Sequence, residues 1–542
     1  MIYLRFDAFR PCFDLVELFV EISGIDLELY KVVCIGTFDR HMHELGAEGM
    51  LTAHITSLNT FDKWKKNVLY LIVLSLEDNI MKIVAFLCTW CSYAGADLAG
   101  TGRNQYPPNI RVIRIPCSGR INPLYIIKAL LEGADGVMVS GCHPGDCHYL
   151  VGNYYARRRF VVLKKLLTTA GFDADLVHFT WVSASEGTRF ADAVRKVTEM
   201  VSAVSANTRQ GDGSSVPVQH ETSNIRKSCN TKTKEPSPCL CLEQEAQLIS
   251  LCGKLFKDGT VSSVIGFQAG GETGLSIPVI IDSADETDKL VWNNRCVPNL
   301  GSYLLERKEK TGIIAKPCDA RAIVNLIVEN QLKREDVYII GMTCEGMVNE
   351  DSAMLPACLD CRAHIPPVYD ILIGEAKNEV NKKLSNLLSP LAGELKNTNP
   401  LDTLDTTRFK NEMSKCILCY SCRQSCYGCY CKTCFMERGE PDWQTASPDM
   451  GAKMLYHLGR ATHLSGRCVE CGACENACAS GVDIRYLIKS VTDFIDETYN
   501  YQTGMDLEAE PVMLIYKADD PEIGFLSFTN DTLQEAGGGA DA

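Results

Sequence analysis

The sequence has no long hydrophobic run, no secretory signal and no excess of basic residues. Its longest apolar candidate, "NVLYLIVLSL" (67–76), is shorter than the ~18 residues that a membrane span needs. The N-terminus lacks a basic start followed by an apolar stretch and a small-residue cleavage site. The net charge of −14 argues against nucleic-acid binding, which normally requires a basic surface. We therefore expect a cytoplasmic protein with no membrane span and no nucleic-acid partner.

Cysteine is the residue that the sequence has in excess. The 542 residues suggest three or four domains at ~150 residues each, and 27 of them are cysteine. In a small secreted domain such cysteines would indicate disulfides, whereas in a large acidic chain without a signal they favour metal binding. The recurring CxxC spacing supports metal binding, because thiolates two residues apart readily bind one centre.

The first eighty residues differ from the rest of the chain. Residues 1–80 carry no motif, whereas Met81 opens "MKIVAFLC" in the manner of a first buried strand. The tripeptide LED at 76–78 can be encoded TTG-GAG-GAT, which contains the ribosome-binding sequence GGAGG shortly before Met81. We expect translation to start at Met81; the alternative is a genuine but divergent extension. No role is predicted for Cys12 or Cys34.

Residues 81–204 alternate between strand-like and helix-like segments. Short apolar runs typical of buried parallel strands lie at 82–87, 109–116, 136–141 and 175–183. Helices are expected at 123–134, 153–170 and 187–201. The alternation predicts an α/β domain with a doubly wound parallel sheet.

Three of these strands are followed directly by a cysteine: Cys88, Cys117 and Cys142. Cys91 and Cys147 lie one short turn further on. The carboxyl ends of parallel strands meet at one edge of a sheet, where open α/β sheets bind ligands, so we expect the five thiols to converge. Five thiolates suit an iron–sulfur cluster. The alternatives are buried free cysteines and a four-cysteine zinc site that would leave one thiol unused.

The same region resembles a known family. The segments "FLCTWCSYAGADLAG", "RIPCSGR", "GCHPGDCHYLVGNYYARRR" and "WVSASEGTRFADAV" look like the iron–sulfur delta subunit of methyl-viologen-reducing hydrogenase. The resemblance implies a 2Fe–2S cluster on the five cysteines and electron transfer to the flavoprotein component of heterodisulfide reductase, its A subunit. His143 and His148 flank these cysteines, and we expect them to be loop residues that bond to the backbone.

A polar linker separates this domain from a second one. Residues 205–243 are rich in Ser, Thr, Asn, Lys and Pro, which predicts a flexible connector. We expect its cysteines to be loop thiols: Cys229, Cys239 and Cys241. From 244 to 375 a second α/β domain is expected, with strands at 276–282 and 337–347 and a strand–turn–helix at 311–331.

Four cysteines of the second domain suit a 4Fe–4S cluster, which usually takes four thiolates. They are Cys318, Cys344, Cys358 and Cys361, with Cys296 as the alternative to Cys318. "IAKPCDARAI", "GMTCEGM" and "CLDCRAHIPPVYDILIGE" are similar to the beta subunits of formate dehydrogenase and of deazaflavin-coenzyme-reducing hydrogenase. That family often carries a flavin as well as clusters. The Gly-rich "GFQAGGETG" (266–274) is not a GxGxxG motif and predicts a surface loop, so FAD binding stays open.

After a polar connector at 376–410, the bacterial ferredoxin spacing CxxCxxCxxxC occurs twice within residues 411–508. The two runs are Cys416, Cys419, Cys422, Cys426 and Cys468, Cys471, Cys474, Cys478. In two-cluster ferredoxins the fourth cysteine of each run binds the other cluster, so Cys478 is expected with the first run and Cys426 with the second. The spacing predicts a ferredoxin-like helical module with two 4Fe–4S clusters; a zinc ribbon is the alternative.

Three more cysteines, Cys429, Cys431 and Cys434, fall outside the ferredoxin spacing. Formate dehydrogenase beta-type chains show a similar "CYxC…CYCxxCF" run, and one of these thiols is an alternative ligand to Cys426. A helix is expected at 449–466. The acidic tail at 509–542 is expected to be disordered.

Several cluster-binding domains on one chain predict a protein that transfers electrons from one cluster to the next. The sequence shows no general acid–base pair, no nucleophile triad and no complete nucleotide motif. By resemblance, we expect an oxidoreductase subunit of an anaerobe that links a formate dehydrogenase or hydrogenase to a heterodisulfide-reductase-A-like flavoprotein of an electron-bifurcating complex. The alternatives are a flavin-bearing subunit that itself reduces NAD or a deazaflavin, and a structural zinc scaffold.

Overall fold

The computed structural model describes residues 81–210, 238–271, 274–375, 401, 404–434, 436, 449–517 and 519–521. The chain divides into two compact units, Met1–Met81 and Lys82–Ala542. Residues 1–80, with Cys12 and Cys34, lie outside the described residues, as does Cys229 of the predicted linker. None of the described helices combines the length and the apolar character that crossing a bilayer would require.

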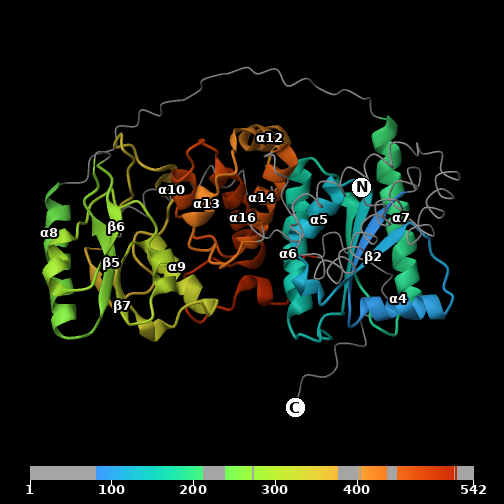
Figure 1. Cartoon of the computed structure of the whole chain (residues 1–542), viewed down its shortest axis with the longest axis horizontal. Coiled ribbons are helices and arrows are strands. Elements are labelled where there is room, and N and C mark those ends of the chain that lie inside the picture. Colours follow the sequence, from blue (N-terminus) through green and yellow to red (C-terminus); the bar gives the residue numbers. More distant parts are fainter. Residues whose placement is uncertain are drawn as a thin grey trace, which may run out of the picture. The chain divides into compact units, whose positions relative to one another are not determined.

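The first α/β domain contains a four-stranded parallel sheet, as predicted. Its strands are β1 (Ile83–Cys88), β2 (Ile110–Ile115), β3 (Gly136–Gly141) and β4 (Val177–Trp181), in the order β2-β1-β3-β4. Its helices are α4 (Ser92–Thr101), α5 (Pro123–Leu131), α6 (Gly152–Ala170) and α7 (Gly187–Gln210). Helix α4 packs with α7, and α5 packs with α6, on opposite faces of the sheet (Figure 1). Helix α4 is an addition to the predicted elements.

Local sequence explains where helix α5 begins and where helix α6 ends. The Asn122 side chain caps α5 by accepting a hydrogen bond from the N–H of Leu124 at 3.2 Å. Pro123 occupies the first helical position, where the missing N–H would have no partner anyway. Helix α6 ends at Gly171, whose φ of +91° is the left-handed conformation that favours glycine.

The second α/β domain contains a mixed five-stranded sheet. Its strands are β5 (Ser263–Gln268), β6 (Ile277–Ile281), β7 (Thr311–Ala315), β8 (Val337–Met342) and β9 (Ile371–Ile373), in the order β6-β5-β7-β8-β9. Strand β6 is antiparallel to β5, and the other neighbouring strands are parallel. Its helices are α8 (Pro238–Lys257), α9 (Pro317–Val328) and α10 (Pro356–Leu359). Strands β5 and β9 are additions to the prediction. Helix α8 begins inside the range predicted as linker, so the prediction that Cys239 and Cys241 lie in a loop is wrong.

The cysteine-rich module, residues 404–517, is built from helices and loops. Its helices are α12 (Thr406–Lys415), α13 (Ser421–Gln424), α14 (Met450–His463), α15 (Ala473–Asn476) and α16 (Ile484–Tyr499). Helix α14 confirms the helix predicted between the two cysteine runs. Asp449 caps α14 by accepting a hydrogen bond from the N–H of Ala452 at 2.7 Å. The described residues of this module contain no strand.

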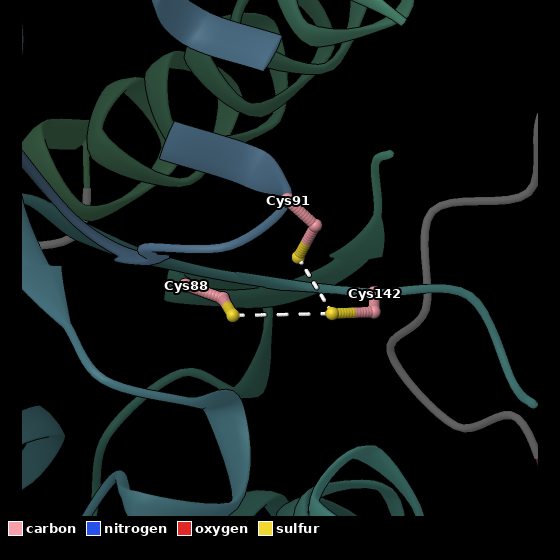
Figure 2. A group of neighbouring side chains, drawn as sticks. All are labelled: Cys88, Cys91 and Cys142. Atoms are coloured by element: carbon pink, nitrogen blue, oxygen red, sulfur yellow. Dashed lines mark hydrogen bonds between the residues drawn. The ribbon is translucent and has the colours of Figure 1, made fainter. Parts of the chain in front are cut away.

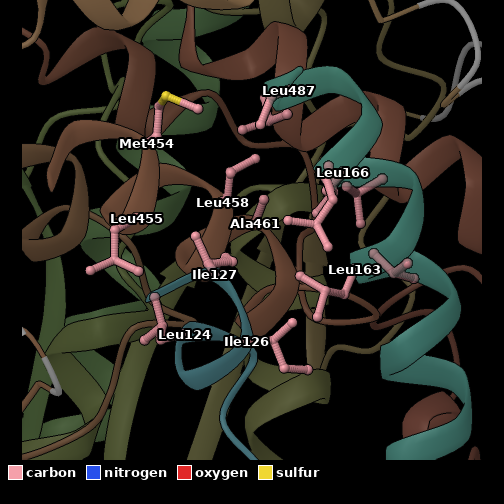
Figure 3. Packing of buried hydrophobic residues seen from close by; sticks show 14 of the residues in the cluster. Leu124, Ile126, Ile127, Leu163, Leu166, Met454, Leu455, Leu458, Ala461 and Leu487 are labelled. Carbon is pink, nitrogen blue, oxygen red and sulfur yellow. The ribbon is translucent and has the colours of Figure 1, made fainter. Parts of the chain in front are cut away.

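One hydrophobic core joins the cysteine-rich module to the first α/β domain. Figure 3 shows side chains from both regions packed together, with Leu124, Ile127 and Leu166 of the first domain beside Leu458 and Ala461 of α14. The contact is close, because a Cβ atom added at Gly459 would overlap the side chain of Leu124. We conclude that α14 is fixed by the first domain.

The second α/β domain also contacts the cysteine-rich module. Ala322 and Leu326 of helix α9 form a small buried cluster with Tyr427 and Val469. At the edge of this cluster, Arg467 Nε and the carboxylate of Glu329 form an ion pair at 2.6 Å. The cysteine-rich module therefore has packed interfaces with both α/β domains.

Part of the predicted acidic tail is ordered. Tyr516 stacks on Tyr154 of helix α6 with ring centroids 4.9 Å apart. The carboxylate of Asp520 is buried in an ion pair with Arg158 of the same helix. The prediction of disorder from residue 509 onward is therefore wrong as far as Asp520, because buried arginines of α6 supply partners for this segment. Residues 522–542 lie outside the described residues.

Candidate metal centres

The carboxyl ends of β1 and β3 bring three buried thiols together. The Sγ atoms of Cys88, Cys91 and Cys142 all lie within 4.8 Å of one another (Figure 2). The Sγ–Sγ distance is 3.9 Å between Cys88 and Cys142 and 2.9 Å between Cys142 and Cys91. The convergence predicted from strand order is therefore observed for these residues.

The other two predicted thiols lie beside this trio. Cys117 Sγ and Cys147 Sγ are 3.7 Å apart, and both are buried. Hydrogen bonds from Cys117, then from Cys142 and Cys91, hold the pKa of Cys88 far below its ordinary value. The bond to Cys88 in turn raises the pKa of Cys117. The five thiols thus form one group in which negative charge is already favoured on one sulfur.

Helix α6 begins next to this group and leaves room for it. A Cβ atom added at Gly152 would collide with the Sγ of Cys117 and lie 3.1 Å from the Sγ of Cys147. The N-terminus of a helix also favours negative charge, because its first N–H groups lack intrahelical partners. A glycine at the start of α6 and four or five converging thiols fit an anionic, cysteine-bound iron–sulfur cluster.

The two histidines near these thiols make other contacts. His143 Nε2 lies 2.7 Å from the carboxylate of Glu186, so its partner is a side chain rather than the predicted backbone group. His148 stacks on Trp90 with ring centroids 3.8 Å apart. Both histidines lie in the loop after β3, and neither contact is to a cysteine.

The first ferredoxin run and the last cysteine of the second run line one pocket. The four cysteines at its walls are Cys416, Cys419, Cys422 and Cys478. Tyr456 and His457 of helix α14 complete the same pocket. The structure thus brings together the four thiols that the crossed ferredoxin pairing predicts.

Both cysteine runs have the same backbone conformation. Leu418 and Tyr420 in the first run have φ angles of +56° and +62°, and Glu470 and Gly472 at the matching positions of the second run have +59° and +71°. Left-handed φ is costly for residues other than glycine. Its repetition at Leu418, Tyr420 and Glu470 therefore indicates a conformation imposed by the site.

This conformation turns backbone N–H groups toward the thiols. The N–H of Leu418 donates to Cys416 Sγ and the N–H of Glu470 donates to Cys468 Sγ, each at 3.3 Å. Donors aimed at sulfur suit a thiolate better than a thiol. The two runs are thus preorganised for anionic ligands in the same way.

The remaining cysteines of the module form a second group. Burial, followed by the charges of Cys426, Cys468 and Cys474, raises the pKa of Cys471 well above its ordinary value. Cys426 therefore lies with the second run, as crossed pairing predicts. A hydrogen bond to Cys429, followed by burial, also raises the pKa of Cys426.

The extra cysteines behave differently from one another. Cys429 is half-buried, and its hydrogen bond to Cys426, supported by the charge of Arg460, lowers its pKa to about 7. Cys431 is exposed, and Cys434 is half-buried. Cys429 is thus the extra thiol that lies directly beside a predicted ligand.

A buried cation interacts with thiols of both groups of the module. Arg460 of α14 is 3% exposed, and its Nη2 donates to the carbonyl of Cys422 at 2.9 Å. Its Nε and Nη1 atoms have no hydrogen-bond partner within the described residues. Burial acts against its charge, but the thiols of Cys474, Cys426 and Cys429 raise the pKa of Arg460 well above its ordinary value. A buried guanidinium beside thiols of both groups fits anionic, cysteine-bound clusters there.

The four predicted cysteines of the second α/β domain, the middle group, are linked by charge interactions, although among the described residues they do not form a set of thiols within 4.8 Å of one another. Burial, followed by the charges of Cys358 and then Cys361, raises the pKa of Cys344 to about 12. The pKa of Cys318 is raised by burial and by the charges of several neighbours, Cys471 of the cysteine-rich module and Cys344 among them. Cys318 thus interacts both with a second cysteine of its own group and with one of the second ferredoxin group.

The alternative to Cys318 has a different environment. Cys296 is fully buried in the core of the second domain, and its Sγ lies 3.9 Å from the carbonyl of Val291 and 3.9 Å from the side chain of Asn293. The Gly-rich stretch 266–274 consists of the end of β5 and a loop, of which residues 272 and 273 lie outside the described residues. These positions give no further candidate ligand.

The first α/β domain is similar to known proteins. Residues 83–205 match the family described as methyl-viologen-reducing hydrogenase, delta subunit. The iron–sulfur D subunit of the vhc F420-non-reducing hydrogenase from Methanococcus voltae is 53% identical over 123 residues, which are 23% of this chain and 85% of that protein. The iron–sulfur D subunit of the F420-non-reducing hydrogenase from Archaeoglobus profundus is 54% identical over 112 residues, or 21% of this chain and 82% of that protein.

The same domain also matches part of a larger protein. The A subunit of the ferredoxin:CoB-CoM heterodisulfide reductase from Methanosarcina mazei is 52% identical over 112 residues, which are 21% of this chain and 14% of that protein. Most of the length of the two hydrogenase subunits is matched at about half identity. Through residues 83–205, the chain therefore belongs to the methyl-viologen-reducing hydrogenase delta subunit family.

Proposed function

We propose that the chain is an iron–sulfur electron-transfer subunit that relays electrons between a formate dehydrogenase or hydrogenase and a heterodisulfide-reductase-A-like flavoprotein. The observation that carries the proposal is the succession of thiol groups within one packed body. The charge of Cys471 contributes to the raised pKa of Cys318 in the middle group. Burial and the charges of several neighbours, Cys474 and Cys478 among them, raise the pKa of Cys422. Iron–sulfur clusters supply one-electron transfer when they are bound to such cysteines.

The residues around the thiols support a relay role in three ways. They bury the five cysteines of the first domain and, in the first ferredoxin run, Cys416 and Cys422, which limits the access of water there, whereas Cys419 is exposed. They direct N–H groups of Leu418 and Glu470 at ligand thiols, which stabilises negative charge. They also fix the groups relative to one another, because the cysteine-rich module shares packed interfaces with both α/β domains.

The first α/β domain supports the flavoprotein end of the proposed relay. Its relatives include iron–sulfur subunits of hydrogenases, and in the Methanosarcina mazei relative the matching segment is part of the heterodisulfide reductase polypeptide itself. A domain that occurs within that polypeptide is suited to lie beside it as a separate chain. We place the 2Fe–2S cluster on the thiols after β1, β2 and β3 and expect the flavoprotein to dock at that sheet edge.

The second α/β domain and the cysteine-rich module support the dehydrogenase or hydrogenase end of the proposed relay. Their motifs resemble beta subunits of formate dehydrogenase and of deazaflavin-coenzyme-reducing hydrogenase. We place one 4Fe–4S cluster on Cys318, Cys344, Cys358 and Cys361 and two more in the ferredoxin-like module. Electrons then pass from the dehydrogenase or hydrogenase through the module to the first domain.

Anaerobic purification of the native complex tests this proposal. We expect the chain to co-purify with a flavoprotein of the heterodisulfide reductase A type and with a formate dehydrogenase or hydrogenase catalytic subunit. In stopped-flow reduction by that catalytic subunit, Cys471→Ser should slow electron arrival at the flavoprotein, whereas the exposed Cys431→Ser should not. Stoichiometric FAD on the isolated chain, with reduction of NAD or a deazaflavin by that chain alone, would overturn the proposal.

A further inference from the structure

Two consecutive residues of helix α14 direct polar atoms at the same thiol group. The hydroxyl of Tyr456 lies 3.3 Å from Cys422 Sγ, and Nε2 of His457 lies 3.3 Å from Cys416 Sγ. Both side chains are buried, with 1% and 2% of their surface exposed. A metal-bound thiolate has no proton to donate, so each contact has to run from the side chain to the sulfur.

These contacts break the symmetry between the two ferredoxin groups. The backbone donors to Cys416 and Cys468 are equivalent. The charge of Arg460 acts on thiols of both groups, more on Cys474, Cys426 and Cys429 than on Cys422. The hydroxyl of Tyr427, which is near the second group, donates instead to the carbonyl of Arg467. Within the described residues, only the first group receives a hydroxyl and an imidazole donor.

The donors are held in place by packing outside the site. The opposite side of α14 is buried against α5 and α6 of the first α/β domain, as Figure 3 shows for Leu455, Leu458 and Ala461. A donor fixed before the electron arrives stabilises the added charge without reorganisation. Hydrogen bonds to ligand sulfurs favour the more negative, reduced state of a cluster and thereby raise its reduction potential.

We propose that Tyr456 and His457 are positioning residues that hold one 4Fe–4S cluster of the module at a higher reduction potential than the other. The cluster concerned is the one assigned to Cys416, Cys419, Cys422 and Cys478. The inference rests on the proposed electron-transfer function, since it requires both clusters to be present. When one electron is shared by the two 4Fe–4S clusters of the module, we expect it to reside mainly on the cluster of the first ferredoxin group.

EPR-monitored redox titration of the anaerobically purified full chain tests the inference. Tyr456→Phe and His457→Leu should each lower the midpoint potential of one 4Fe–4S centre, while His457→Gln, which keeps a donor, should restore most of it. We expect up to a tenfold change in the electron-sharing equilibrium per lost bond, which is about 59 mV for a one-electron couple. Cys419→Ser, which alters a ligand of the same group, should change the EPR signal of that centre and so identify it.

Tyr499→Phe is the matched control, because Tyr499 has a buried hydroxyl with no hydrogen-bond partner in the described part of the chain. It should shift no potential. Full iron content with unmoved potentials, equal shifts of both centres, or the same shift in Tyr499→Phe would overturn the inference while leaving the proposed function intact. A wild-type chain without iron would instead overturn the proposed function. If His457→Leu loses iron, Tyr456→Phe decides, since it removes a single oxygen atom.

Discussion

Arg158 and Asp520 form a buried two-point ion pair across 362 residues of chain. Arg158 Nε donates to Oδ2 of Asp520 and Nη2 donates to Oδ1, each at 2.8 Å. The neighbouring Arg157 donates to the carbonyls of Lys517 and Asp520 at 2.9 and 2.8 Å. In this chain, Arg157 and Arg158 of the hydrogenase-delta-like domain are thus bound by the segment that follows the cysteine-rich module.

Asp520→Asn should strongly destabilise the packing of this segment on helix α6. The change leaves a buried guanidinium without its counter-charge, and breaking a buried pair typically costs about 3–5 kcal/mol. Chemical denaturation followed by fluorescence, together with proteolysis around residue 511, measures the effect. Asp519→Asn is the control, because Asp519 is exposed. Equal stability of the two variants would contradict the buried-pair interpretation.

Gly152→Ala should remove the cluster of the first α/β domain and leave the others. The added methyl group would occupy the space that the thiols of Cys117 and Cys147 need. Iron should fall by about two atoms per chain if that centre is 2Fe–2S. Gly100→Ala, in helix α4, is the control because a Cβ there meets no atom within 4 Å. Unchanged iron content in Gly152→Ala would show that Cys117 and Cys147 are not ligands of the cluster.

Cys426→Ala should retain most of the iron of the second ferredoxin group. Cys429 lies within hydrogen-bonding reach of Cys426, so its sulfur is close to the position that the variant empties, and the charge of Arg460, which the variant keeps, favours its thiolate. The double variant Cys426→Ala/Cys429→Ala should lose about four irons per chain. Cys426→Ala/Cys431→Ala, which removes an exposed thiol instead, should behave like the single variant. Full loss of four irons in Cys426→Ala alone would show that Cys429 cannot replace it.

The stability of the first α/β domain should fall as the pH is lowered from about 6.5 toward 4. Burial, followed by the charge of Lys164, lowers the pKa of His178 to about 4. Between these pH values the unfolded chain binds a proton at this histidine and the folded chain does not. The free energy of unfolding therefore falls by up to about 1.4 kcal/mol per pH unit for this group. His178→Gln should flatten the slope of unfolding free energy against pH, whereas His148→Gln, at an exposed position, should preserve it. Identical slopes would exclude His178 as a cause.

Much of the first domain could be predicted from sequence because its strands are continuous apolar runs. Strands such as 82–87 and 136–141 stand out, and each ends at a cysteine. The sheet order then brings Cys88 and Cys142 together without further assumptions. Helix α4 was missed because its sequence, "SYAGADLAGT", has small residues and weak apolar periodicity.

The contacts between domains could not be predicted. Helix α14 is recognisable as a helix, but nothing in its spacing indicates that one side packs on Leu124 while Tyr456 and His457 reach two thiols. Such contacts depend on tertiary packing between segments hundreds of residues apart. The acidic composition of the tail suggested disorder for the same reason, since the partner of Asp520 lies on a distant helix.

Iron, acid-labile sulfide and flavin analysis of the anaerobically purified full chain, combined with EPR, tests the central claim most directly. One 2Fe–2S and three 4Fe–4S centres predict roughly fourteen irons with matching sulfide and no stoichiometric flavin. A content of about ten irons would show that no cluster is bound by Cys318, Cys344, Cys358 and Cys361, and would leave the other assignments unchanged. A colourless protein that contains zinc and no iron would contradict the account.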